Sequence, residues 1–309
     1  MPPRRVFAPL LRSLALIALI AALPGLAAAR TATPSASAVP NFRHIFVIVL
    51  ENHSYGDIIG NAKLPYLNSL AKDYGLATAS YSVTHPSLPN YLALTGGDTF
   101  GVTSDCTDCF VKAPNLVDQL ETAGKSWKAY MDGMPSPCFL GNHDQYAQKH
   151  NPFIYYDDVR TNSDRCGKIV PFTDLASDLK ANTMPDFVWI TPDQCHDMHS
   201  CPREQGDAWL KTEVPKILAS PAWKDGGALF ITFDEGTSND GCCGQSGGGH
   251  IATLVISPLV APGTRVSTPI DHYSLLRTIE DAWGMPHLGS ADKASSLAGF
   301  FTAATPVAG

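Results

Sequence analysis

Acidic, amide and imidazole side chains follow three strongly apolar runs of the sequence. The runs are HIFVIVL at residues 44–50, FVWI at residues 187–190 and ALFITF at residues 228–233. The polar residues that follow them are Glu51 and Asn52, then Asp193, His196, Asp197 and His199, and finally Asp234 and Glu235. Carboxylates combined with amides and imidazoles suit a hard or borderline divalent cation. The pattern predicts a metal site, and the alternative is a set of solvated loops and helix caps.

A hydroxyl group that could act as a nucleophile lies in the segment THPSLPNY. Ser87 stands between Pro86 and Pro89, just before a segment, YLALTGG, that we expect to be helical. Prolines fix the backbone φ angle and pre-order such a turn. A helix N-terminus favours an anion such as phosphate, so Ser87 is a candidate nucleophile for phosphate chemistry. The alternative is that Ser87 serves only as a helix N-cap.

Strands and helices that could position these residues alternate along the chain. We expect strands at residues 44–50, 125–131, 187–190, 228–233 and 251–256. Apolar residues at helical spacing predict helices at residues 64–74, 116–123, 208–218 and 272–283. A strand that is apolar throughout suits burial on both faces, as in a parallel sheet. The alternation therefore predicts an α/β fold with a mainly parallel sheet, whose ligand site lies beyond the carboxyl ends of the strands.

The composition favours a folded protein with its own core. Of the 309 residues, 44% are hydrophobic and 17% are charged, which excludes a disordered chain. The formal net charge is −7 and no basic patch stands out, so we expect no nucleic-acid partner. Neither a P-loop nor a G-x-G-x-x-G motif after a strand occurs, which disfavours the common nucleotide-binding folds.

The N-terminal residues are expected to lie outside the fold. Residues 1–29 have three arginines, an apolar stretch and a terminal Ala-Ala-Ala, which is typical of a secretory signal peptide; an uncleaved membrane anchor is the alternative. We therefore expect a secreted or periplasmic protein with no transmembrane segment after cleavage. Residues 30–40 are predicted to be a disordered linker. Residues 41–309 are predicted to form one domain, in which residues 132–183 are an irregular insertion.

The chain contains eight cysteines, an even number that suits disulfides in an exported protein. Eight cysteines allow 105 pairings, so spacing can only rank them. The simplest pairs are neighbours in sequence: Cys106 with Cys109, Cys138 with Cys166, Cys195 with Cys201, and Cys242 with Cys243. A zinc site at Cys106-x-x-Cys109 is the alternative for that pair, but it lacks a second pair at matching spacing.

Six ordered motifs resemble the bacterial phosphoesterase family of acid phosphatases and phospholipases C. They are HIFVIVLENHSYGDIIG, THPSLPNYLALTGG, DMH followed by QGDAWL, ITFDEG, GGHIATLVISP and DHYSLLRTIEDAWG. Within that family the chain is most similar to the short secreted acid phosphatases, including the mycobacterial type that acts on phosphatidylinositol 3-phosphate. The resemblance covers residues 41–290. It implies a three-layer, alkaline-phosphatase-like core with helices on both faces of the sheet.

The resemblance also implies roles for particular residues. It assigns a divalent metal ion, of unknown identity, to two pairs of residues, Glu51 with Asn52 and Asp234 with Glu235. It makes Ser87 the nucleophile, with Thr84 as the fallback. The candidates for phosphate binding or for acid and base catalysis are His85, His199, His250 and, beside His199, Asp197.

These roles predict a secreted, metal-dependent phosphomonoesterase that forms a phosphoserine. Its partner would be a phosphate ester, with phosphoinositides and a phospholipid at a membrane surface among the substrates that the resemblance implies. The nearest alternative is a phospholipase C, which would cleave the other ester bond of a phospholipid. An alternative of another class is a disulfide-stabilised binding module whose carboxylates hold a calcium ion.

Overall fold

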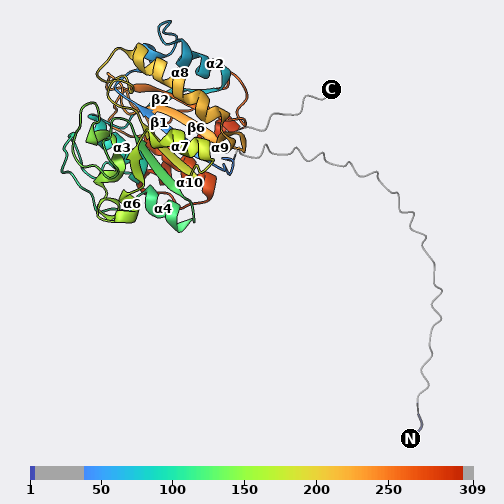
Figure 1. Ribbon diagram of the computed structural model, residues 1–309. Coiled ribbons are helices and arrows are strands. Elements are labelled where there is room, and N and C mark those ends of the chain that lie inside the picture. Colours follow the sequence, from blue (N-terminus) through green and yellow to red (C-terminus); the bar gives the residue numbers. More distant parts are fainter. Residues whose placement is uncertain (4–37, 302–309) are drawn as a thin grey trace. The chain divides into compact units, whose positions relative to one another are not determined.

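The computed structural model describes residues 1–3 and 38–301 of the protein (Figure 1). The predicted signal peptide and the predicted linker therefore lie almost wholly outside the described residues. The predicted domain is described up to residue 301. None of the helices within the described ranges combines the length and the apolar character needed to cross a membrane.

The core of the protein is one eight-stranded sheet in the order β4-β3-β5-β1-β6-β7-β2-β8. The strands are β1 (Ile45–Leu50), β2 (Gly75–Tyr81), β3 (Trp127–Met131), β4 (Ile169–Pro171), β5 (Phe187–Thr191), β6 (Ala228–Phe233), β7 (His250–Ile256) and β8 (Arg265–Val266). Neighbouring strands are parallel except at β7, which is antiparallel to both β6 and β2. The prediction of an α/β fold with a mainly parallel sheet is confirmed.

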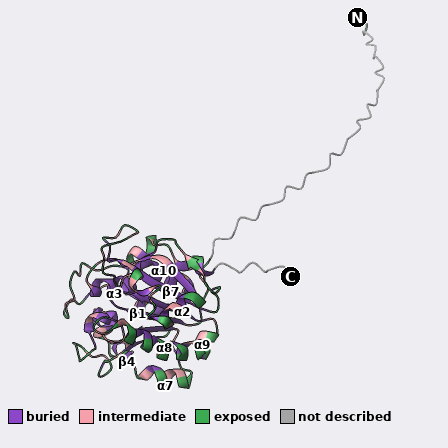
Figure 2. Ribbon diagram, turned by 90° about the horizontal axis from the view of Figure 1, so that it is seen from above, coloured by how far each residue is buried: buried purple, intermediate pink, exposed green. Residues whose placement is uncertain are grey.

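Helices cover both faces of this sheet, because the side chains of each strand alternate between the faces. On β1, Ile45, Val47 and Val49 belong to one buried cluster, whereas Phe46 and Ile48 belong to the other. The first cluster includes residues of α3 (Ser87–Gly96), α4 (Leu116–Thr122) and α10 (His272–Trp283), and the second those of α2 (Pro65–Asp73) and α8 (Arg203–Ala219). Figure 2 shows the buried residues on the strands and exposed residues on the outer parts of α7 and α8. The predicted three-layer arrangement is therefore also confirmed.

The remaining helices are short and lie in the connections. They are α1 (Tyr55–Ile58), α5 (Asp157–Arg160), α6 (Ser163–Cys166), α7 (Asp174–Ala181) and α9 (Pro221–Lys224). Four further segments are 3-10 helices: η1 (Gln148–His150), η2 (Pro152–Tyr155), η3 (Gly289–Lys293) and η4 (Leu297–Phe301).

Capping residues set the ends of α10, the helix with the clearest apolar stripe. The side chain of Asp271 accepts a hydrogen bond from the Ser274 backbone N–H, and the Ser274 hydroxyl donates to Asp271 Oδ1. Such a side-chain acceptor satisfies one of the N–H groups that have no partner inside the helix. Gly284 ends the helix in the left-handed conformation, with a φ of 63°. Glycine adopts this conformation without steric cost, so the helix stops there.

Several elements differ from the sequence-based expectation, among them α8, β2 and β7. Helix α8 begins at Arg203, whereas the sequence predicted a start at residue 208. The earlier start was not predicted because the first turn of the helix is polar and lacks an apolar stripe. Strand β2 was not expected at all, since its sequence, GLATASY, has no strong apolar alternation. Strand β7 was expected, but its antiparallel direction was not, because an apolar run does not indicate the direction of a strand. Residues 132–183, which we predicted to be an irregular insertion, contain β4, which belongs to the central sheet, and the helices α5, α6 and α7.

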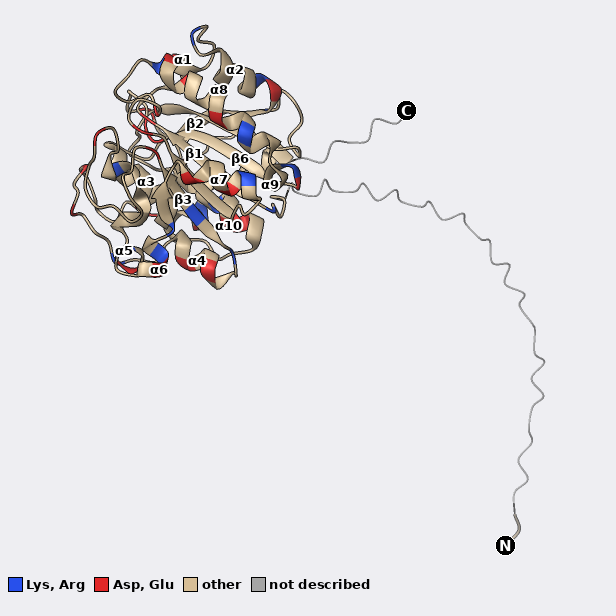
Figure 3. Cartoon of the chain, in the orientation of Figure 1, with Lys and Arg blue, Asp and Glu red and all other residues tan. Residues whose placement is uncertain are grey.

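The four expected cysteine pairs are all present as disulfides. They join Cys106 to Cys109, Cys138 to Cys166, Cys195 to Cys201, and Cys242 to Cys243. The zinc alternative for the first pair is therefore wrong. Lysine and arginine residues are scattered over several elements of the structure rather than gathered on one face (Figure 3).

Candidate active site

The parallel pairing of β1 with β6 brings two distant acidic residues together. Leu50 pairs with Phe233 at the carboxyl ends of these strands, so the next residues, Glu51 and Asp234, lie at the same edge of the sheet. The backbone N–H of Asn52 donates to Oδ1 of Asp234 over 3.0 Å, although 182 residues separate the two. The structure thus brings together the two acidic pairs that the sequence placed after separate strands.

Four acidic side chains at this edge are buried: Glu51, Asp197, Asp234 and Glu235. Burial, and after it the neighbouring charge of Glu235, raises the pKa of Asp234 to about 7. Burial also raises the pKa of Asp197 to about 8. The pKa of Glu51 lies well above its usual value, first because of burial and then because of the charges of Asp234 and Asp197. The acids therefore form a site that favours a cation or a proton among them.

Ser87 is the first residue of α3, and its hydroxyl points into this acidic cluster. Its Oγ lies 3.2 Å from Oε2 of Glu51 and 3.3 Å from Oε1 of Glu235. The side chain of Ser87 is fully buried. Thr84, the fallback nucleophile, is only partly buried and bonds through its hydroxyl to the carbonyl of His85. The arrangement gives Ser87 the closer relation to the acids.

His85 links the turn before Ser87 to Glu235. Its Nδ1 forms a short hydrogen bond with Oε2 of Glu235, and its Nε2 lies 3.0 Å from the carbonyl oxygen of Ser238. Burial alone would lower the pKa of His85, but the hydrogen bonds to Glu235 and Ser238 raise it overall. Since both ring nitrogens face acceptors, the charged imidazolium is favoured, and His85 holds Glu235 in place.

His199 lies at the exposed border of the cluster, and Asp197 lies inside it. The backbone N–H of His199 donates to Oδ1 of Asp197 over 2.7 Å, which fixes the loop after β5. The His199 ring bonds to the hydroxyl of Ser200 through Nδ1. Burial, with the charges of Lys149 and His150, lowers the pKa of His199. Nε2 of this imidazole has no hydrogen-bond partner within residues 38–301 and is therefore available to a ligand.

His250 is the site residue that the structure keeps apart from the acids. Its ring stacks between Tyr55 and Tyr81, with centroid distances of 4.5 and 5.0 Å. Its Nε2 bonds to the carbonyl oxygen of Thr78 over 3.0 Å. His250 therefore fixes the start of β7 against β2 and is not in contact with Ser87.

Two further residues from the loop after β5 form a separate group. Nδ1 of His196 lies 2.7 Å from Oδ2 of Asp132 and 3.3 Å from Oδ1 of Asp193. The pKa of His196 is raised, mainly by the hydrogen bond to Asp132. These half-buried residues do not extend the acidic cluster around Ser87.

Four residues that contact the cluster were not among the site residues predicted from the sequence. His150, in η1, lies 3.3 Å from Oε1 of Glu51 and 3.2 Å from Oδ2 of Asp197 through its two ring nitrogens. Burial lowers the pKa of His150 to about 3. The other three residues are Lys149, Asp105 and Tyr91. Nζ of Lys149 lies 3.5 Å from Ser87 Oγ and 2.8 Å from Oδ2 of Asp105. The hydroxyl of Tyr91 donates to Glu51.

Only one of these four residues could have been found from its spacing. Tyr91 follows Ser87 by four residues on α3, so a helix places both side chains on one face. Lys149 and His150 come from the irregular insertion, and Asp105 from the loop after α3. Asp105 also accepts a hydrogen bond from the Leu88 N–H and so caps the start of α3. Loop positions of this kind carry no periodic signal.

A glycine-rich segment before β7 holds the Ser87 turn against the end of β6. A Cβ atom on Gly248 would lie 2.0 Å from Ser82 Oγ and 2.1 Å from the carbonyl oxygen of Thr84, so no other residue fits. The Gly248 carbonyl accepts a hydrogen bond from the Gly236 N–H, and the Gly248 N–H donates to the carbonyl oxygen of Ser82.

The segment Gly244–Gly248 matches the motif G-x-S-x-G. It precedes a strand instead of following one, so it is no nucleophile elbow.

The described side chains fit a divalent cation. Among residues 38–301, Oδ2 of Asp234 is buried without a hydrogen-bond partner. Buried polar atoms normally have partners, so this carboxylate oxygen is available to a cation. A cation would also remove the repulsion between the buried carboxylates. The donors combine carboxylates, an amide, an imidazole and a hydroxyl, a set that suits a hard or borderline metal.

Comparisons with known proteins agree with this geometry. The model of the phosphoesterase family matches residues 60–286. A phosphatidylinositol-3-phosphatase from Mycobacterium tuberculosis is 34% identical over 268 residues, which cover 85% of this chain and 84% of that protein. A probable acid phosphatase from Kluyveromyces lactis is 33% identical over 81% of this chain, but the match spans only 60% of that longer protein.

The fold also has solved neighbours. A protein of the alkaline phosphatase superfamily from Vibrio parahaemolyticus superposes with a TM-score of 0.54 at 14% identity. The match covers 83% of this chain and 71% of that chain. At this identity the likeness concerns the fold alone, and it confirms the alkaline-phosphatase-like core.

Proposed function

Because the chain belongs to the phosphoesterase family, and so to hydrolases of phosphoric esters, we propose that it is a secreted, metal-dependent phosphomonoesterase with Ser87 as its nucleophile. The observation that carries this proposal is the position of Ser87 Oγ, within 3.3 Å of carboxylates from two different strand ends. The N-cap position of α3 is Pro86, so Ser87 lies inside the helix and does not serve as its N-cap.

Four residues would hold the metal ion: Glu51, Asn52, Asp234 and Glu235. When bound, a divalent cation stabilises negative charge on a phosphate oxygen and favours the ionised form of a nearby hydroxyl. The buried acids compensate its charge. His150 contacts Glu51 and is itself in contact with Asp197, so the two residues would keep the Glu51 carboxylate oriented.

The chain's own residues account for the remaining steps. Ser87 Oγ attacks phosphorus as its proton passes to a neighbouring carboxylate, and the bond from phosphorus to the leaving oxygen breaks. Lys149 Nζ, 3.5 Å from Ser87 Oγ, would pair with a phosphate oxygen. His199 would donate a proton to the leaving alcohol. Water then cleaves the phosphoserine and restores the hydroxyl.

The substrate that this proposal favours is a phosphomonoester, with phosphoinositides as one class. A mycobacterial relative of similar length bears a phosphatase name and matches over most of both chains, which favours a phosphatase over a phospholipase C. Membership of a hydrolase family likewise favours an enzyme over a calcium-holding binding module. Secretion rests on residues 1–29, whose sequence is typical of a signal peptide.

The experiment is a product assay with matched variants. The protein is supplied with phosphatidylinositol 3-phosphate and with phosphatidylcholine, and inorganic phosphate and diacylglycerol are both measured. We expect phosphate from the first lipid and no diacylglycerol from either. Ser87→Ala should lower phosphate release by about a thousandfold or more, whereas Thr84→Ala should retain most of it. Diacylglycerol as the main product would transfer the proposal to a phospholipase C.

A further inference from the structure

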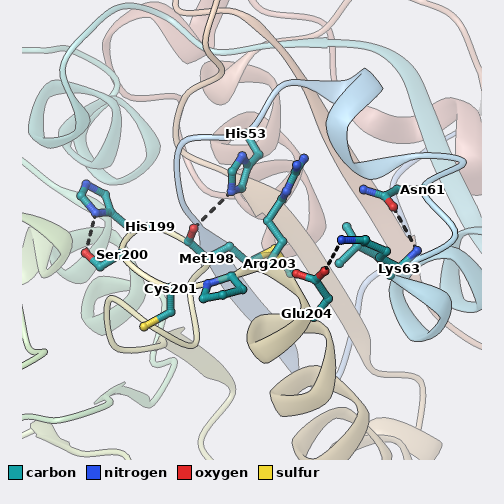
Figure 4. Close-up of a pocket in the computed structure, with 11 residues that line it drawn as sticks. His53, Asn61, Lys63, Met198, His199, Ser200, Cys201, Arg203 and Glu204 are labelled. Carbon is teal, nitrogen blue, oxygen red and sulfur yellow. Dashed lines mark hydrogen bonds and ion pairs between the residues drawn. The ribbon is translucent and has the colours of Figure 1, made fainter.

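A cavity of about 320 Å3 lies beside the candidate active site (Figure 4). Its lining comes from the loop after β1, the segment before α2, the loop after β5 and the first turn of α8. Two lining residues, His53 and His199, lie one and two residues beyond Asn52 and Asp197. A volume of this order suits a small polar molecule. Of the lining residues, only His199 takes part in the proposed chemistry.

Two cationic side chains give the cavity its character. Nζ of Lys63 lies 3.1 Å from Oε1 of Glu204. This contact uses one of the three N–H donors of the Lys63 ammonium group. Nη1 of Arg203 donates to the carbonyl oxygen of Asp57 over 3.0 Å. The same Nη1 lies 3.3 Å from Oδ1 of Asp57. Within the described part of the chain, Nε and Nη2 of Arg203 have no hydrogen-bond partner. Figure 4 shows Lys63, Arg203 and Glu204 close together on one side of the cavity.

The start of α8 adds to this preference for negative charge. Arg203 is the first residue of this 17-residue helix, and no side chain caps its N-terminus from the preceding Pro202. The partial positive charge of a helix N-terminus favours an anion. The free donors of Arg203 and the helix start therefore favour the same kind of ligand.

Short contacts connect the cavity to Ser87. The ring centroid of His199 lies 5.9 Å from that of His150. Nε2 of His150 lies 3.3 Å from Oε1 of Glu51, whose Oε2 lies 3.2 Å from Ser87 Oγ. His199, which lines the cavity, therefore lies next to the side chains that contact Ser87, so the cavity borders the candidate active site.

We propose that this cavity binds the leaving alcohol of substrates that carry a second anionic group, and that Lys63 and Arg203 bind that group. The inference rests on the proposed function and names the substrate class of the same site. The second anion is a phosphate ester, present either in the headgroup of a lipid or in a soluble bisphosphate. The polar and charged lining suits an alcohol of this kind and not an acyl chain.

The test compares substrates that differ only in the second anion. Initial phosphate release is measured with myo-inositol 1,3-bisphosphate and with myo-inositol 3-phosphate, and the ratio of the two kcat/KM values is taken. Lys63→Gln should lower this ratio by about fivefold, the effect of one partly exposed charge pair. Glu204→Gln should raise it, because the substitution removes a competing negative charge. Lys72→Gln, on the exposed surface of α2, is the matched control and should leave the ratio as in the unmodified protein.

Opposite changes in two variants separate binding from a loss of folding, which would lower activity in both. Dioctanoyl phosphatidylinositol 3-phosphate is a third substrate in this test. A similar fall of its kcat/KM in Lys63→Gln would identify the lipid headgroup as a ligand. A fall confined to the bisphosphate would identify the soluble ester. An unchanged ratio in both variants would overturn the cavity's role. Absence of Ser87-dependent hydrolysis of every substrate would instead overturn the proposed function.

Discussion

Ser87 Oγ lies 3.2 Å from Oε2 of Glu51, although the two residues are separated by 36 positions and belong to different elements. Glu51 follows the central strand β1, whereas Ser87 begins α3. The contact places a hydroxyl at the edge of a parallel sheet, among buried carboxylates. Ligand sites of open α/β folds lie at this edge.

The ammonium group of Lys149 should bind the phosphate of the substrate. Lys149→Met removes a charge-assisted hydrogen bond worth about 1.5–3 kcal/mol, so kcat/KM for p-nitrophenyl phosphate should fall by roughly 10-fold to 100-fold. Lys149→Arg keeps the charge and should restore part of the loss. An unchanged kcat/KM in Lys149→Met would remove Lys149 from the proposed site.

Metal binding should stabilise the folded protein as well as support activity. Extensive chelation should abolish phosphate release, and one divalent cation should restore it. At a hundred times its dissociation constant, such a ligand adds about 2.7 kcal/mol to the free energy of unfolding. Differential scanning fluorimetry should therefore show a rise in Tm on addition of the metal.

Asp234→Asn provides the matched variant for this measurement. It keeps the acceptor for the Asn52 N–H but removes a full negative charge from the proposed ligand set. The metal-dependent rise in Tm should be smaller in this variant, and its activity should fall. Full activity after chelation, or an equal rise in Tm in both proteins, would contradict a metal held by Asp234.

Glu280 of α10 should make the protein less stable as the pH rises from 5 to 8. Its carboxyl group is fully buried, and burial raises its pKa to about 7. A group whose pKa is raised by folding adds stability below its unfolded pKa, and this stability is lost as the pH passes through the folded pKa. The difference of pKa corresponds to a loss of about 3 kcal/mol at high pH.

Glu280→Gln isolates this effect. The variant retains an acceptor for the Leu288 N–H, which bonds to Oε1 over 2.8 Å, but it does not ionise. Its Tm relative to the original protein should rise steadily from pH 5 to pH 8. Asp73→Asn, at an exposed acid on α2, should show no such trend. A constant difference in Tm for Glu280→Gln would show that the carboxyl group does not titrate in this range.

The disulfide between Cys138 and Cys166 should stabilise the insertion at residues 132–183. It closes a loop of 28 residues, which in the chain-entropy account corresponds to about 3–4 kcal/mol. The double variant Cys138→Ala/Cys166→Ala should lose about this much on urea unfolding. Thiol titration of the denatured, unreduced protein should detect no free thiol, and a stoichiometric signal would contradict the four pairings.

Much of the fold could be predicted from local sequence. The strands β1, β5 and β6 are buried on both faces, so they are apolar throughout, and the acids that follow them mark the carboxyl edge of the sheet. Glu51 and Asp234 could be predicted as site residues in the same way, since each stands immediately after such a strand. Ser87 was found through its prolines and the helix that follows.

The remaining contacts arise from tertiary structure. Lys149 and His150 lie in a 3-10 turn of an irregular segment, where neither position nor periodicity indicates what they will touch. His250 stood before an apolar run and looked equivalent to the other histidines, but its ring is held between two tyrosines. Such outcomes depend on how loops fold over the sheet edge, and a sequence pattern does not encode this locally.

The most direct test of the account is the identity of the phosphorylated residue. The protein is mixed with excess substrate and quenched in acid within one turnover, and its peptides are analysed by mass spectrometry. We predict one phosphoryl group on the peptide that contains Ser87, and none in Ser87→Ala. A phosphoryl group on Thr84 or on a histidine, or normal turnover by Ser87→Ala, would contradict the central claim.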